Sequence, residues 1–263
     1  MGAPVVFIHG LWVAKGAWQP WIDKFAAAGH EAVAPGWPGE AETAEETRAN
    51  PGTQAGVGIQ EVTAAFARAA TAFDTPPVLV GHSFGGLIAQ KLLGQGVGAG
   101  AVAISPAPMK GVLNLPISQL RAASPVLGNP ANRSKAKGLT REQYRYAFGN
   151  ALPPEESDEL YDRTAIPSPA KPLFEGAVAN FSPRSAAMVE VGNSHRGPLL
   201  IVGASEDHTV PASSSRSSFK RYHASPAVTE YKEFAGRGHS LTLDKGWTDV
   251  ADHVLDWLGQ KGL

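Results

Sequence analysis

The chain has 263 residues, of which 43% are hydrophobic and 18% charged, and its formal net charge is −1. This composition is typical of a globular protein with a sizeable core, and the small net charge gives no overall field that favours nucleic acid or an anionic membrane. Because the chain contains no cysteine, disulfides, thiolate metal sites and thiol catalysis are excluded.

In chain order, short apolar runs rich in β-branched residues alternate with longer segments of helical character. The predicted strands are residues 5–9, 31–34, 78–81, 101–105, 199–203 and 228–234. The predicted helices are residues 18–28, 59–73, 87–93, 213–222 and 247–258. Continuous apolar strands are typical of a parallel sheet with helices on both faces. The alternation therefore predicts an α/β fold with a doubly wound, mostly parallel six-stranded sheet, whose ligands bind at the carboxyl ends of the strands.

Residues 107–195 interrupt this alternation. They are rich in Pro, Gly and Asn, contain no convincing strand, and have helix signals at residues 140–148, 155–161 and 173–181. Nearly 90 residues is too long for a plain connection between two core strands. We therefore expect residues 1–106 and 196–263 to form the core domain, and residues 107–195 to form a helical cap over the ligand-binding end of the sheet.

The sequence GHSFG at residues 81–85 matches the pattern G-x-S-x-G, between a predicted strand and a predicted helix. Glycines on both sides of Ser83 permit a tight turn, because a β-carbon there would collide with neighbouring backbone. The turn raises the serine hydroxyl to the tip of the sheet and places it at a helix N-terminus, which favours negative charge. We predict Ser83 as a nucleophile; a glycine-rich turn without chemistry is the alternative.

A serine nucleophile needs a general base, which a third group orients. Of the eight histidines, His239 lies in the turn GRGHS directly after the last predicted strand, where a loop can bring an imidazole over Ser83. Glu206 and Asp207 follow the preceding strand, and Asp207 stands three residues before Val210, where the next helix begins. We predict His239 as the base and Asp207 as the acid. A surface-loop role for His239, and Glu206 as the acid, are the alternatives.

Acyl transfer also needs hydrogen-bond donors aimed at the developing oxyanion. We expect one donor to be the backbone N–H of Phe84, the residue after the nucleophile. The second is expected from Leu11, in the loop HGLW at residues 9–12, where Gly10 lets the backbone approach a substrate. His9 is expected to support this loop through hydrogen bonds.

These motifs resemble those of the α/β-hydrolase superfamily over essentially the whole chain. The strand before the His-Gly motif begins at residue 4, without the antiparallel hairpin with which superfamily members commonly start. This trimmed start is similar to the group of small plant-type methyl esterases and hydroxynitrile lyases and their bacterial relatives. The resemblance implies the α/β-hydrolase fold and extends the assignment of Ser83, Asp207 and His239 as a triad. The matching landmarks are His9-Gly10, residues 81–85, Asp207 before Val210-Pro211, Gly238-His239, GAW at residues 16–18 and AGH at residues 28–30.

We expect the substrate pocket between the strand tips and the cap. The residues expected to border it are apolar: Trp12, Phe84, Met109, Leu113, Leu115, Ile117 and Leu120. No arginine cluster marks a site for phosphate or carboxylate, so a neutral small ester or lactone is the expected substrate, with no nucleic-acid partner. No metal-ligand spacing or phosphate-binding loop is present, so neither a metal nor another cofactor is expected.

The sequence therefore predicts a serine hydrolase of carboxylesterase type that acts through an acyl-enzyme. One alternative is a lyase, or a cofactor-free perhydrolase or haloperoxidase, that uses the same triad; another is a hydrolase-fold receptor with little turnover. In the resembling lyases an extra lysine near the pocket assists the leaving group, and Lys110 is the lysine closest in sequence to a strand tip. No signal-peptide pattern and no uninterrupted run of about 18 apolar residues is present, so we expect a cytoplasmic protein without a membrane partner.

Overall fold

The computed structural model describes residues 2–114 and 116–263. Its centre is a six-stranded sheet in the order β2-β1-β3-β4-β7-β8, in which each pair of neighbouring strands runs parallel. The strands are β1 (Val5–Ile8), β2 (Ala32–Val33), β3 (Val78–His82), β4 (Gly100–Ile104), β7 (Leu199–Ala204) and β8 (Thr229–Phe234). The predicted fold class is therefore confirmed, and each predicted strand overlaps an observed one.

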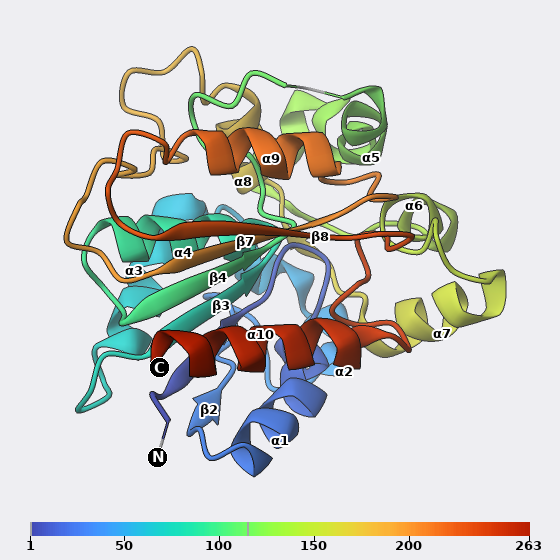
Figure 1. Ribbon diagram of the computed structural model, residues 1–263. Helices are drawn as coiled ribbons and strands as arrows, with labels where there is room; N and C mark the ends of the chain where they lie inside the picture. The colour runs from blue at the N-terminus through green and yellow to red at the C-terminus, as the bar shows by residue number, and fades with distance from the viewer. Residues whose placement is uncertain (1, 115) are drawn as a thin grey trace.

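Helices cover both faces of the sheet (Figure 1). The helices α1 (Gln19–Ala27) and α10 (Trp247–Lys261) pack on one face, and α3 (Ile59–Ala70), α4 (Phe84–Gly94) and α9 (Ala212–Lys220) pack on the other. The apolar stripe of α10 lies against the sheet, because four residues at positions i, i+1, i+4 and i+8, which share one helical face, are fully buried. They are Val250, Ala251, Val254 and Leu258.

An aromatic cluster fastens α1 to the first strand. The ring of Phe7 stacks on Trp18, with centroids 4.8 Å apart, and meets the edges of Trp21 and Phe25 at 5.9 and 5.1 Å. Such pairs contribute about 0.5–1.5 kcal/mol each beyond the burial of their area. The strand that leads to the His-Gly motif is thus held rigidly from this face.

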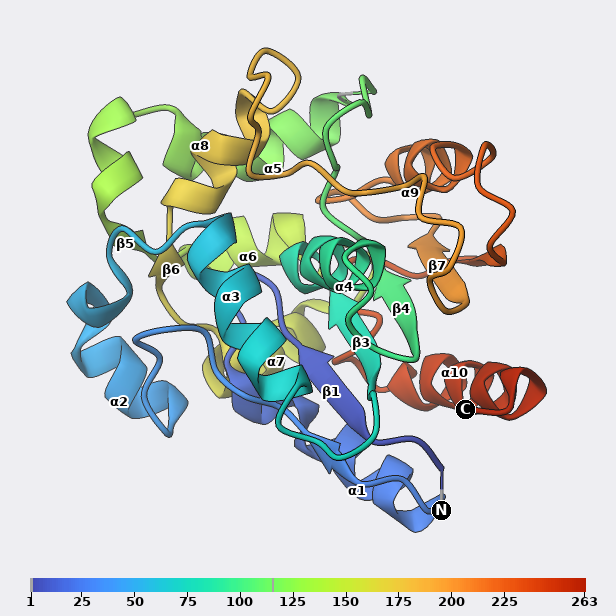
Figure 2. The same cartoon turned by 90° about the vertical axis from the view of Figure 1, so that its left-hand side faces the viewer.

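Residues 107–195, which we call the inserted segment, join β4 to β7. In the part of the chain that the structure describes, they form the helices α5 (Ile117–Leu127), α6 (Arg141–Ala147), α7 (Pro154–Thr164) and α8 (Lys171–Ala177). The helix α5 contacts α6 and α8, and α6 contacts α7 (Figures 1 and 2). Thr140 and Gln143 form a capping box at the start of α6, within the helix signal at residues 140–148.

Hydrogen bonds join the inserted segment to loops that follow two strands of the sheet. After β1, the backbone N–H of Trp12 donates to Ser168 Oγ at 2.7 Å, and its indole N–H donates to Lys137 O at 3.0 Å. After β7, the hydroxyl of Thr209 donates to Ala147 O at 2.7 Å. The inserted segment therefore lies over the carboxyl ends of the parallel strands, which is the end where ligands bind in such sheets.

Three local features differ from the prediction. The inserted segment does contain strands: β5 (Ala136–Lys137) pairs antiparallel with β6 (Ser168–Pro169), but two residues are too few to show a period. The helix α2 (Ala44–Ala49) was not predicted because six residues give no clear apolar stripe, although Thr43 caps it. The helix α5 was not predicted because it contains Pro125, and proline usually ends a helix.

None of the helices in residues 2–114 and 116–263 combines the length and the apolar character that a bilayer span requires.

Candidate active site

Ser83 occupies a strained turn between β3 and α4. Its φ is 56° and its ψ −121°, a region that residues with a side chain rarely adopt. A β-carbon at Gly81 would overlap the backbone of Gly85, and one at Gly85 would overlap the carbonyl of Ile8. Strain of this kind costs about 1–3 kcal/mol and persists where the surroundings enforce it. The two flanking glycines therefore allow the close packing that holds Ser83 at the strand tip.

The loop after β1 approaches Ser83 closely. A β-carbon at Gly10 would lie 2.6 Å from Ser83 Cβ, so a larger residue would displace the loop. The backbone N–H groups of Leu11 and Phe84 donate to no acceptor within the described residues. Both residues line the same cavity as Ser83. The predicted oxyanion donors are thus brought together beside the serine.

The side chain of His9 holds this loop in place through contacts with Gly10 and Glu40. Its Nδ1 lies 2.8 Å from Gly10 O, and its Nε2 lies 2.8 Å from the buried carboxylate of Glu40. Burial alone would raise the pKa of Glu40, but the neighbouring His9 and hydrogen bonds from the N–H groups of Lys15 and Trp37 outweigh burial and lower it. The supporting role of His9 was expected from the sequence, whereas no sequence pattern connects it to Glu40, which lies 31 positions away.

Asp207 and His239 form a buried pair at the ends of β7 and β8. Asp207 Oδ2 lies 2.7 Å from His239 Nδ1, and both side chains are shielded from solvent. The other carboxylate oxygen, Oδ1, accepts from the backbone N–H of Thr209 at 2.8 Å and of Val210 at 2.7 Å. These bonds fix the carboxylate so that it faces the imidazole.

The adjacent Glu206 has different hydrogen-bond partners from those of Asp207. Its side chain is exposed and accepts from the hydroxyl of Ser205 at 3.0 Å, while its carbonyl accepts from the side chain of Asn150 at 2.6 Å. The structure therefore places Asp207, and not Glu206, beside His239.

The imidazole of His239 packs against two rings that no sequence pattern connects to it. His82, the residue before Ser83, has its ring centroid 4.5 Å from that of His239, and Phe148 of the inserted segment meets His239 at 4.9 Å. Burial, and then the nearby His239, lower the pKa of His82 well below its ordinary value, so His82 is neutral. His239 Nε2 is buried and has no hydrogen-bond partner within the described residues.

A second network holds the turn that carries His239. The carboxylate of Asp244 accepts from the hydroxyl of Ser240 at 3.0 Å and from the N–H of Gly246 at 3.0 Å, and it pairs with Arg237. Burial nonetheless raises the pKa of Asp244. This network was not predicted, because its members are spread over ten residues without a recognisable motif.

An apolar cavity of about 470 Å³ opens beside Ser83. This volume falls in the range of small-molecule sites. Among the described residues its wall includes no Asp, Glu, Lys, Arg or His, and its polar side chains are Ser83, Gln119, Asn180 and Thr209. Apolar residues from the sheet loops and the inserted segment form the rest.

The structure brings most of the predicted pocket residues to this cavity. Trp12 and Met109 are buried in its wall, and Leu113 lies at its edge with 77% of its surface exposed. Ile117 does not line the cavity and is 84% exposed, contrary to the expectation. Leu115 lies outside the described residues.

Lys110 does not line the cavity either. Its ammonium donates to the carbonyls of Ser182 at 2.8 Å and Pro183 at 3.2 Å. No group of three or more His, Asp or Glu side chains in residues 2–114 and 116–263 could hold a metal ion.

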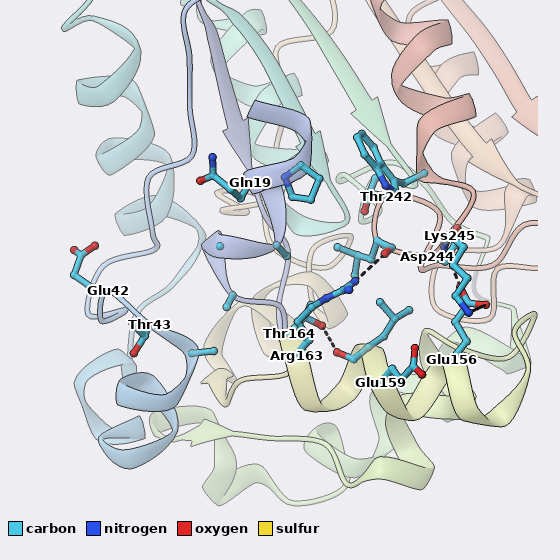
Figure 3. A pocket seen from close by; sticks show the side chains of 18 residues that line it. Gln19, Glu42, Thr43, Glu156, Glu159, Arg163, Thr164, Thr242, Asp244 and Lys245 are labelled. Carbon is cyan, nitrogen blue, oxygen red and sulfur yellow. Dashed lines mark hydrogen bonds and ion pairs between the residues drawn. The ribbon is translucent and has the colours of Figure 1, made fainter. Parts of the chain in front are cut away.

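A second hollow, of about 630 Å³, borders the turn that carries His239 (Figure 3). Its wall includes Arg163 and Glu159 of α7 and the backbone of residues 242–245, and the guanidinium of Arg163 donates to Leu243 O at 3.3 Å. None of Ser83, Asp207 and His239 lines it.

Comparisons with known proteins agree with the fold. Residues 5–253 match the model of the alpha/beta hydrolase family, whereas no curated protein matches the chain. A monoacylglycerol lipase from Paleococcus ferrophilus is similar in structure, with 22% identity, a TM-score of 0.67, and 99% of this chain and 97% of that chain covered. A thermophilic esterase from Thermogutta terrifontis has 15% identity and a TM-score of 0.69, with 100% and 92% covered. An extracellular alpha/beta-hydrolase from a Paenibacillus species, described as sharing structural and functional homology with tobacco salicylic acid binding protein 2, has 17% identity and a TM-score of 0.68, with 99% of each chain covered.

Proposed function

Since the chain belongs to the alpha/beta hydrolase family, we propose that it is a serine hydrolase of small, largely apolar carboxylic esters or lactones. In this proposal Ser83 is the nucleophile, His239 the general base and Asp207 the acid that orients it. The observation that carries it is the strained Ser83 at a strand tip together with a buried Asp–His pair 2.7 Å apart, whose imidazole lies 4.5 Å, between ring centroids, from that of His82, the residue before Ser83. The family and the lipase and esterase names of similar structures support ester hydrolysis in general.

The geometry supports a two-step mechanism. With Nδ1–H donating to Asp207, His239 has Nε2 available to take the proton from Ser83 Oγ as that oxygen attacks the ester carbonyl. The negative charge that develops on the carbonyl oxygen would be stabilised by the free N–H groups of Leu11 and Phe84. Collapse of the tetrahedral intermediate breaks the bond to the alcohol, which leaves with the proton from His239.

Hydrolysis of the acyl-enzyme reuses the same groups. His239 Nε2 takes a proton from water, the resulting hydroxide adds to the acyl carbon, and Ser83 leaves as the protonated hydroxyl. The carboxylate of Asp207 stabilises the imidazolium in both steps. No external cofactor is needed for this sequence of proton transfers.

The cavity supports the proposed substrate class. A wall without ionisable side chains cannot pair with a charged substrate group, and burying such a group unpaired is costly. Trp12, Met109 and Leu113 are proposed to contact the apolar acyl or aryl part of the ester. The inserted segment supplies much of this wall, so we propose that residues 107–195 act as a cap that sets specificity.

The lyase alternative has less support. A lysine that assists a leaving group must reach the substrate, whereas the ammonium of Lys110 donates to two backbone carbonyls and does not line the cavity. A receptor without turnover would not need free donors beside a strained serine, but only a measurement of turnover separates it from an enzyme.

The test is covalent labelling of the folded protein with a fluorophosphonate probe, followed by mass spectrometry of the labelled peptide and rate measurements on a panel of esters and lactones. We expect one adduct, on Ser83, and hydrolysis of neutral esters. Heat-denatured protein is the control, since an unfolded serine has no activated hydroxyl. Ester turnover without an adduct on Ser83 would contradict the proposed nucleophile, and an adduct without turnover of any ester or lactone would favour the receptor.

A further inference from the structure

Four large apolar side chains of the inserted segment are exposed at or near the mouth of the cavity. They are Leu113, Ile117, Leu120 and Phe181, which are 77%, 84%, 50% and 87% exposed, and we call them the apolar rim. Three of them also line the cavity beside Ser83. Ile117 lies one helical turn before Leu120 on α5 and therefore shares its face. Exposed apolar groups that gather in this way mark interaction surfaces.

The stretch of chain that carries most of the apolar rim is cationic, although the whole chain has a net charge of −1. Between Asp74 and Glu142 the sequence contains seven Lys and Arg residues and no Asp or Glu. Arg121 follows Leu120 on α5, Arg133 lies in the short helix η3 (Pro130–Ser134) that contacts α5, and both are exposed.

Two further charged residues, Arg184 and Glu175, affect the net charge around the apolar rim. Arg184, three positions after Phe181, is also exposed. The nearby carboxylate of Glu175 on α8 faces α3 instead, where it accepts from the N–H of Ile59 at 2.8 Å and lies 4.0 Å from Lys171. The apolar rim is thus flanked by positive charge on more than one element.

We propose that the apolar rim docks onto the surface of an anionic lipid aggregate, so that the cavity opens toward the lipid. Apolar side chains would enter the boundary between headgroups and acyl chains, while Arg121, Arg133 and Arg184 meet the acidic headgroups. The proposal rests on the proposed function for one point, namely that the ligand delivered to Ser83 is a lipid ester. It replaces the expectation from net charge that the protein has no affinity for an anionic membrane.

Charge and position together favour a lipid surface over a second copy of the chain. In a two-fold dimer the same patch meets itself, so the exposed arginines of both copies would be brought to one interface and would repel. A protein partner of any kind would also cover the mouth of the cavity, since Leu113, Leu120 and Phe181 belong to both. A lipid surface covers the mouth as well, but it supplies the ligand.

The test is flotation of the full chain with vesicles of phosphatidylcholine alone and of phosphatidylcholine mixed with phosphatidylglycerol. We expect binding to the anionic vesicles, weaker binding to the neutral ones, and loss of binding as salt is raised. Ile117→Ser removes an exposed side chain that does not line the cavity, and it should weaken binding about tenfold. Its rate on a short, monomeric acetate ester should stay unchanged.

Val228→Ser is the matched control, because Val228 is 49% exposed and lies outside the apolar rim, directly before β8. It should bind vesicles as the wild type does. Arg133→Glu should weaken binding to anionic vesicles more than to neutral ones, because it reverses one charge.

Three outcomes would overturn the proposal: no flotation with either vesicle, equal losses in Ile117→Ser and Val228→Ser, or a dimer that Ile117→Ser dissociates. The inactive variant Ser83→Ala should float like the wild type, so vesicle binding is measured separately from the proposed chemistry.

Discussion

The cavity beside Ser83 and the hollow in Figure 3 have walls that differ in kind. The hollow has the larger volume, about 630 Å³ against 470 Å³, and its wall includes exposed Glu159 and Arg163. The cavity has no ionisable side chain in its described wall, but it contains the strained Ser83 and two backbone N–H groups that have no acceptor among the described residues.

This difference shows why neither volume nor charge alone marks a reactive site. In the hollow, Glu159 and Arg163 are exposed to water, which screens their charges, and the buried Asp244 is already paired with Arg237. Beside the cavity, the groups proposed to react are few and buried: two backbone N–H groups hold Asp207, and the carboxylate of Asp207 in turn lies against His239. A developing charge is stabilised more strongly by fixed donors away from water than by mobile charges within it.

Ser83→Ala should have the largest effect. It removes the proposed nucleophile and little else, because the side chain sits at a turn and contributes little to the core. We expect kcat for ester hydrolysis to fall by about 10⁴-fold or more, with the thermal unfolding midpoint near that of the wild type. Activity close to the wild-type value would mean that the cavity is not where the chemistry occurs.

Asp207→Asn should rank next, with a loss of about 10⁴-fold in kcat, because an amide neither holds the imidazole tautomer nor stabilises the imidazolium. Glu206→Gln is the matched control: it makes the same chemical change one residue away, on an exposed side chain, and should alter kcat by less than about twofold. Steady-state kinetics of both variants on one ester measure the contrast. A reversed order would assign the acid to Glu206.

Met109→Ala should have a smaller and selective effect, since Met109 is buried in the cavity wall and does not take part in proton transfer. Each methylene-sized contact changes discrimination between substrates by about 1–3 kcal/mol. We expect the ranking of acyl chain lengths to change while the rate on an acetate ester is largely kept. The measurement is kcat/KM across a p-nitrophenyl ester series, and an equal loss on every ester would indicate damaged folding or catalysis.

Glu159→Gln should have the smallest effect. It removes a charge from the wall of the hollow without touching the cavity, so kcat/KM should stay within about twofold of the wild type. If the loss were instead comparable to that of Met109→Ala, the hollow would communicate with His239 through the turn that they share. Arg163→Gln would then report whether the hydrogen bond to Leu243 carries that communication.

Much of the core could be predicted because its signals are local. Strands buried on both faces appear as short apolar runs, and the glycines at 81 and 85 leave a recognisable pattern around Ser83. The inserted segment was less predictable: α5 tolerates an internal proline, and the pairing of β5 with β6 depends on residues 31 positions apart. Glu40, Phe148 and Asp244 were missed for the same reason, since each acts through a partner that no short motif connects to it.

The sequence by itself determined the order of strands and helices, the serine turn, and the residue types from which an acid and a base could be chosen. These follow from periodicity and from backbone rules that act over a few residues. Only the tertiary structure decided that Asp207 rather than Glu206 faces His239, that Ile117 points to solvent rather than into the cavity, and that cationic residues surround the apolar rim. Those outcomes depend on the packing of the inserted segment against the strand tips, and such packing joins residues that are distant in the chain.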